Sequence, residues 1–181
     1  MPKGKDFEIL KYHSLYEQTK KEGDEMVNQK RNTKGGKMNS KGNKKTNPTY
    51  EKMMNAIRDK EKTLKDVFRP IDYALPGGYA DATAKIVIVD TNNNQIRKIF
   101  GSIKSIDMRL KNKSDYDNLL NEIYMLMPSI IYAKKRKLIN DSLYDIFKEC
   151  IKPEKLKSKE DFYSFAKFME ALVAYCKKED F

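Results

Sequence analysis

Cationic side chains are concentrated between Thr91 and Lys137, and they are the groups in this chain best suited to chemistry with a partner. This stretch holds ten Lys and Arg residues against four acids, a net charge of +6, whereas residues 138–181 hold eight bases and nine acids, net −1. Such a basic region attracts polyanions, because each Lys or Arg can neutralise a phosphate. The ten cations are Arg97, Lys98, Lys104, Arg109, Lys111, Lys113, Lys134, Lys135, Arg136 and Lys137.

Helical spacing would order these charges. At 100° per residue, Arg97, Lys104 and Lys111 fall on one flank of a helix, about 10 Å apart, and Lys98 and Arg109 fall on its outward face. The run from Lys134 to Lys137 surrounds one helical turn, so that part of its charge must face outward. Tyr132 stands next to this run and could stack on a base or ribose.

A plainer interpretation stays open, in which these charges are solvated helix faces that hold ordinary ion pairs. Lys outnumbers Arg by 31 to 6, a bias that genome base composition can produce by itself. That bias accounts for the abundance of Lys but not for its clustering. Spacing alone does not distinguish RNA from DNA as the partner.

Other chemistry is poorly represented. His13 is the only histidine, and no zinc, haem or Gly-rich phosphate-loop motif is present. Gly35-Gly36 and Gly77-Gly78 are typical of turns, and Cys150 and Cys176 lack metal-type spacing, so we expect buried free thiols. We therefore expect no enzymatic activity, no cofactor and no metal.

The elements that would carry the cations are helices, and we expect an all-α fold, a compact bundle of five or six helices. Apolar stripes at helical spacing predict this bundle over residues 48–181. Residues 1–47 predict a short helix over 6–20 and then a flexible basic segment, because residues 21–48 contain almost no apolar side chain.

Capping residues and prolines set the expected helix ends. The first bundle helix is predicted from residue 48 to about 69, where Pro70 ends it. Further helices are predicted over 93–112 and 116–127, another that ends at about residue 151, and a last one that begins after Ser158. Pro128 either kinks the helix before it or starts a new one. The β-branched run Lys85–Asp90 reads as a buried strand on its own, but no second strand is available to pair with it, so we expect a buried helix over about 79–89.

Three segments together resemble a known family. They are NNNQIRKIFGSIKSI, MPSIIYAKKRKLI and FYSFAKFMEALVAYCKK, and in this order they are similar to the small subunit of the type III-A CRISPR effector, the Csm complex. The matching positions are Ile96-Arg97-Lys98, Met127-Pro128 with Tyr132-Ala133, and Glu170-Ala171 with Val173-Ala174-Tyr175 and Lys177. The resemblance covers about residues 91–178, and residues 1–47 have no clear counterpart in it.

The resemblance implies a non-catalytic all-helical subunit that binds the guide RNA–target RNA duplex and stacks with further copies of itself beside other subunits of the Csm complex, in antiviral defence. By match, the RNA-contacting candidates are Arg97, Lys98, Lys134, Lys135 and Arg136. Helical geometry adds Lys104, Arg109 and Lys137, and adjacency adds Tyr132.

Two other functions remain open at this point. One is a stand-alone helical DNA- or ribosome-binding protein, which would act without partner subunits. The other is an interaction scaffold whose charge serves only solubility. The first ten residues lack an apolar signal core, and the longest uncharged apolar stretch is too short to span a bilayer, so we expect a cytoplasmic protein without a membrane partner.

Overall fold

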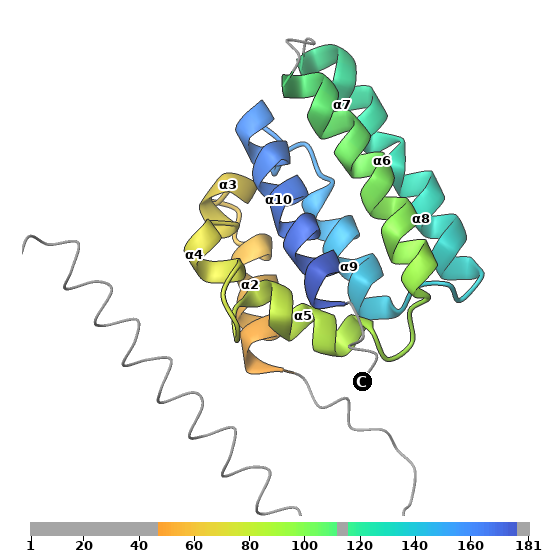
Figure 1. Cartoon of the computed structure of the whole chain (residues 1–181). Helices are drawn as coiled ribbons and strands as arrows, with labels where there is room; N and C mark the ends of the chain where they lie inside the picture. Colours follow the sequence, from red (N-terminus) through yellow and green to blue (C-terminus); the bar gives the residue numbers. More distant parts are fainter. Residues whose placement is uncertain (1–46, 112–115, 177–181) are drawn as a thin grey trace, which may run out of the picture. The chain divides into compact units, whose positions relative to one another are not determined.

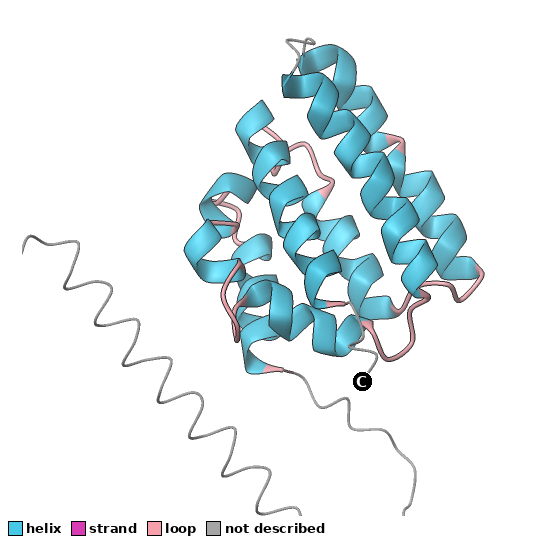
Figure 2. Ribbon diagram, in the orientation of Figure 1, coloured by secondary structure: helices cyan, strands magenta, loops and turns pink. Residues whose placement is uncertain are grey.

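The computed structural model describes residues 47–111 and 116–176, and every regular element in these ranges is a helix (Figures 1 and 2). The all-α prediction is therefore confirmed for the described part of the chain. Three sequence features lie outside the described residues: the predicted helix over 6–20, most of the predicted flexible segment over 21–48, and Lys113. The predicted domain boundary at residue 47 lies at the edge of the first described range. The helices are α2 (Pro48–Arg58), α3 (Leu64–Val67), α4 (Pro70–Tyr73), α5 (Tyr79–Val87), α6 (Asn93–Lys111), α7 (Tyr116–Tyr124), α8 (Leu126–Lys135), α9 (Asp141–Cys150) and α10 (Lys159–Tyr175).

The last helix, α10, is central to the packing. It contacts α6 on one side and α5, α3 and α4 on the other, while α9 contacts α8, α2 and α5. In Figure 1, α10 accordingly lies between the α2–α5 group and the layer of α6, α7 and α8. This helix begins after Ser158, as predicted, and Ser158 and Asp161 form a capping box there.

Aromatic side chains fill the contacts of α10 with the end of α3 and with α9. Phe68 stacks on Phe168 with ring centroids 4.3 Å apart, and Phe147 meets Phe165 edge-on at 5.7 Å. All four rings are almost fully buried. Offset stacks and edge-on pairs of this kind contribute about 1 kcal/mol each beyond their burial, so they hold α3 and α9 against α10.

The helix predicted from 48 to about 69 is wrong, because the chain forms two helices there. Thr63 and Asp66 form a capping box that starts α3. Between α2 and α3, the buried ammonium of Lys155 donates to the carbonyl oxygens of Asp59 and Lys62, the latter at 2.8 Å. Pro70 also differs from its prediction, because it occupies the first turn of α4.

The predicted helix over 116–127 is too long, because α7 ends at Tyr124 and α8 begins at Leu126. The remaining helix predictions agree with the structure to within two residues. Helix α5 begins at Tyr79 as predicted but ends at Val87, so it includes only the first part of the β-branched run. Helix α6 lies within one residue of its predicted ends. Pro128 lies in the first turn of α8 and so belongs to a new helix that follows α7. Cys150 and Cys176 are buried free thiols. The extra helices beyond the expected five or six arise from the breaks after Arg58 and at Met125 and from the single turn α4.

Asp161 gives the first testable prediction. Its fully buried carboxylate accepts hydrogen bonds from the backbone N–H groups of Lys65, Lys157 and Ser158, at 2.9–3.1 Å, and from the Ser158 hydroxyl at 3.0 Å. Asp161→Ala would leave these donors unpaired, so we expect the free energy of unfolding to fall by about 2–4 kcal/mol in urea titrations.

The exposed acid Glu154 offers a matched control. We expect Glu154→Ala to change the free energy of unfolding by less than about 0.5 kcal/mol. Equal stability of the two variants would show that the Asp161 contacts do not join α3 to α10.

Candidate nucleic-acid interface

Helix α6 presents an exposed face without an acidic residue. Asn92 caps the helix, because its side-chain oxygen accepts from the backbone N–H groups of Asn94 at 2.9 Å and Gln95 at 3.3 Å. Arg97 and Lys98 follow within the first two turns, and both are exposed. The only acid in this helix is Asp107, which is buried and ion-paired with Lys111. The exposed charge of α6 is therefore positive.

Helix α8 ends in a turn that exposes three consecutive cations. The backbone N–H of Lys137 donates to the carbonyl of Lys134 at 2.9 Å, and that of Leu138 donates to the carbonyl of Ala133 at 2.9 Å. This pair of bonds is a Schellman motif, in which the residue after the cap adopts a left-handed conformation. Here that residue is Lys137, with φ of 56°, where glycine is usual. Lys135, Arg136 and Lys137 are all exposed.

Tyr132 forms a unit with Arg136, one turn later on the same face of α8. The guanidinium carbon lies 5.5 Å from the ring centroid, and Nη1 donates to the phenol oxygen at 3.0 Å. The ring is 59% exposed, although the same helix buries Ile130 and Ala133. An exposed aromatic face beside a guanidinium is suited to stacking on a base while the cation contacts a phosphate.

Two contacts show that α6 runs antiparallel to the α7–α8 segment. The backbone N–H of Asn92 donates to the carbonyl of Leu138 at 3.0 Å, and the Arg109 guanidinium meets Glu122 at the other end. In two antiparallel segments, residues that lie level with each other have a nearly constant sum of residue numbers. This sum is 230 for the first pair and 231 for the second, so Lys98 lies level with about residue 132. The start of α6 and the end of α8 therefore share one end of this layer (Figure 1).

Three of the predicted cations are held by carboxylates. Lys104 lies 3.4 Å from Glu170 on α10, and Arg109 makes two bonds to Glu122 at 2.7 and 2.6 Å. Lys134 pairs with Asp141 and lies 5.4 Å from the ring centroid of Tyr144. These pairs lower the charge that the three cations can offer to a polyanion. Lys111, which was expected on the same flank as Lys104, is likewise paired.

The remaining five cations have no carboxylate within ion-pair distance among the described residues. Together with Tyr132 they make the α6/α8 cationic end, a name used below for Arg97, Lys98, Tyr132, Lys135, Arg136 and Lys137. All six side chains are exposed. The structure therefore divides the predicted set into this exposed group and three ion-paired cations.

The ion pairs also shift the pKa values of their acids. A hydrogen bond from Arg109 lowers the pKa of Glu122 below its ordinary value, and the same bond raises the pKa of the guanidinium. Hydrogen bonds from Lys167, and then from Lys104, lower the pKa of Glu170. These acids stay ionised at neutral pH and continue to neutralise their partners.

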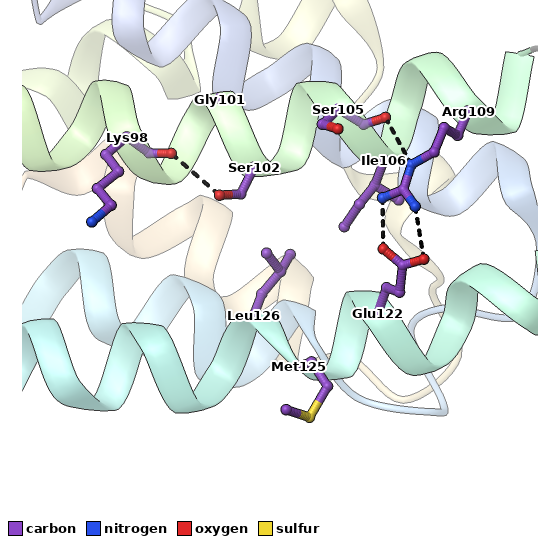
Figure 3. A pocket seen from close by; sticks show the side chains of 9 residues that line it. All are labelled: Lys98, Gly101, Ser102, Ser105, Ile106, Arg109, Glu122, Met125 and Leu126. Atoms are coloured by element: carbon purple, nitrogen blue, oxygen red, sulfur yellow. Dashed lines mark hydrogen bonds and ion pairs between the residues drawn. The ribbon is translucent and has the colours of Figure 1, made fainter.

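An open groove of about 560 Å³ lies between α6 and the α7–α8 segment (Figure 3). Lys98 lies at one end and the Arg109–Glu122 pair at the other, and Met125 lies on the opposite wall. Sequence reasoning missed this groove and Glu122, because the two walls come from different helices. Sequence reasoning also missed Asn140, whose side chain donates to the carbonyl of Ile86 and accepts from the backbone N–H of Leu143. The pattern Asn140-Asp141-Ser142 signals a helix start and could have indicated this residue.

Neither a metal centre nor a membrane span occurs in the described ranges. No group of three or more His, Cys, Asp or Glu residues within 47–111 and 116–176 could hold a metal ion. Among the described helices, none combines the length and apolar character that crossing a membrane requires.

The left-handed backbone of Lys137 gives a prediction about stability that does not depend on its role as a cation. A left-handed conformation disfavours any residue with a Cβ by about 1 kcal/mol. We therefore expect Lys137→Gly to raise the free energy of unfolding by about that amount in urea titrations. Lys135→Gly, at the last residue of α8, is the matched control and should lower stability, because glycine disfavours helix. A destabilised Lys137→Gly variant would contradict the Schellman turn.

One family of known proteins matches this chain. The family model described as Csm2 Type III-A matches residues 70–180, whereas no curated protein and no solved structure matches the chain. The matched range begins at α4 and includes every residue of the α6/α8 cationic end. Since it covers 111 of 181 residues, the chain belongs to the Csm2 Type III-A family, the non-catalytic small subunit of the type III-A CRISPR Csm complex.

Proposed function

We propose that this protein binds the guide RNA–target RNA duplex of a cytoplasmic type III-A ribonucleoprotein through the α6/α8 cationic end, without catalysing a reaction itself. In this role it packs with further copies of itself as an inner filament beside the other subunits. The Lys and Arg side chains neutralise phosphates and fix the path of the duplex, and base sequence is left to pairing between the RNA strands.

One observation carries the proposal most directly: five cations are exposed at the same end of two antiparallel helices, without carboxylate partners among the described residues. Arg97 and Lys98 come from α6, Lys135 is the last residue of α8, and Arg136 and Lys137 come from the turn that follows it. Charges that are close together and unpaired release more counterions on binding RNA than charges that already pair with acids. This favours a phosphate contact over a purely solvated face.

The left-handed Lys137 adds support. The Schellman turn would be more stable with glycine, so the lysine is retained at a conformational disadvantage. A charge that projects beyond the helix end accounts for that choice, because glycine would remove it. An unfavourable backbone conformation of this kind is a reason to look for function at the residue.

Contacts with other protein chains are supported by the apolar part of α8. Met125, which precedes this helix, is 66% exposed, and Ile131 is 38% exposed. Pro128 is exposed between them. Exposed apolar side chains of this kind are typical of a surface that another protein covers. Because Met125 also lines the groove between α6 and the α7–α8 segment, we assign only Pro128 and Ile131 to contacts with neighbouring subunits or copies.

Charge removal tests the RNA contact. We expect Lys98→Gln and Arg136→Gln each to weaken binding of a labelled guide–target RNA duplex to the full chain, and each to reduce the slope of log affinity against log salt by roughly 0.7–0.9. Arg97→Glu should weaken binding further, since it adds a repulsive charge. Fluorescence anisotropy at several salt concentrations measures both quantities.

Lys104→Gln is the matched control, because Lys104 lies within ion-pair distance of Glu170, a carboxylate that it shares with Lys167. Its salt slope should stay near that of the unchanged protein, and circular dichroism should show equal helicity in all variants. If Lys104→Gln and Arg136→Gln lower the slope equally, or if neither does, the α6/α8 cationic end is not the RNA contact. Tighter binding to duplex DNA than to the RNA duplex would favour the stand-alone DNA-binding alternative.

A further inference from the structure

The two ends of the groove between α6 and the α7–α8 segment differ in charge. At one end Lys98 is exposed and has no carboxylate partner among the described residues. At the other end the Arg109 guanidinium faces Glu122 across the groove and donates to both carboxylate oxygens (Figure 3). One groove therefore begins with an available cation and ends with a neutralised one.

Between these ends the α6 wall offers little obstruction. Lys98 and Arg109 are eleven residues apart, about 16 Å along the helix. Gly101, Ser102 and Ser105 line the wall between them, and a Cβ added at Gly101 would meet no atom within 4 Å. No acid other than Glu122 lines the groove. A phosphate chain that reaches Lys98 thus passes these small residues on the α6 wall, with Ile106, Met125 and Leu126 as the bulkier lining residues, and it meets no other anion before Arg109.

The geometry of the ion pair decides what Arg109 can do there. A bidentate pair occupies the edge of the guanidinium that would otherwise bind two phosphate oxygens. An approaching phosphate also meets the charge of Glu122, and like charges in contact repel. The side chains are 44% and 48% exposed, so solvent screens the pair and its removal should leave the fold intact.

We propose that Glu122 withholds Arg109 from RNA and so sets where the RNA-contacting surface ends along the groove. This inference rests on the proposed RNA-binding function. In this account Arg109 is a latent phosphate ligand, and removing the Glu122 charge extends the surface by one contact.

Glu122→Gln is the decisive variant, and the full chain and the same labelled guide–target RNA duplex are used. We expect its salt slope to steepen by roughly 0.7–0.9 and its affinity to rise roughly fivefold at moderate salt, as one added phosphate contact requires. Arg109→Gln alone should bind within about twofold of the unchanged protein. The double variant Glu122→Gln/Arg109→Gln should also return to that level, because the freed cation is then gone.

Glu61→Gln is the matched control, since it removes the same charge at an exposed position outside the groove. If Glu122→Gln binds no better than Glu61→Gln while Lys98→Gln still weakens binding, the role of Glu122 is refuted and the RNA surface stands. If the double variant Glu122→Gln/Arg109→Gln binds as weakly as Lys98→Gln, Arg109 already contacts RNA in the unchanged protein and the inference is overturned. If Lys98→Gln has no effect, the proposed function fails and this inference fails with it.

Discussion

The arrangement of this molecule depends on one polar junction, at Asn140. Its side-chain amide donates to the carbonyl of Ile86 at 3.0 Å, and its side-chain oxygen caps α9 through the backbone N–H of Leu143 at 2.9 Å. Its own backbone N–H donates to the Thr91 hydroxyl at 3.1 Å. One residue thereby joins the end of α5, the start of α6 and the start of α9. Because α9 follows directly after the Schellman turn of α8, the junction also fixes where the cations of that turn lie relative to α6.

This constraint explains why some cations are available and others are not. With the start of α6 fixed against the end of α8, the later turns of α6 run alongside α10 and α7, where Lys104 reaches Glu170 and Arg109 reaches Glu122. Arg97 and Lys98 lie too near the start of α6 to have an equivalent acid among the described residues. The charge of this region is thus sorted by helix packing, and the exposed remainder lies at the end that we assign to RNA. Membership of the Csm2 Type III-A family makes the chain a subunit of the type III-A CRISPR Csm complex.

Local sequence signals predicted most of the helices but only part of the site. The capping box of Ser158 and Asp161 and the apolar stripe of α6 act within one or two turns, so they can be read from a single segment. The break after Arg58 depends on Lys155, which lies almost 100 residues away in the sequence, although the capping box at Thr63 was a readable sign of it. Ion pairs between helices could not be predicted from a single segment. Helical spacing gave Lys104 and Arg109 as candidate RNA contacts, but the acids that pair with them come from other helices. Only the tertiary structure brings those charges together.

The central claim is that exposed cations contact RNA and ion-paired cations do not, and lysine reactivity tests it most directly. The full chain is acetylated lightly with and without the guide–target RNA duplex, and modification at each lysine is measured by mass spectrometry. The account predicts that RNA protects Lys98, Lys135 and Lys137 and leaves Lys104 and Lys111 unchanged. Equal protection at all five lysines, or protection confined to Lys104 and Lys111, would contradict it.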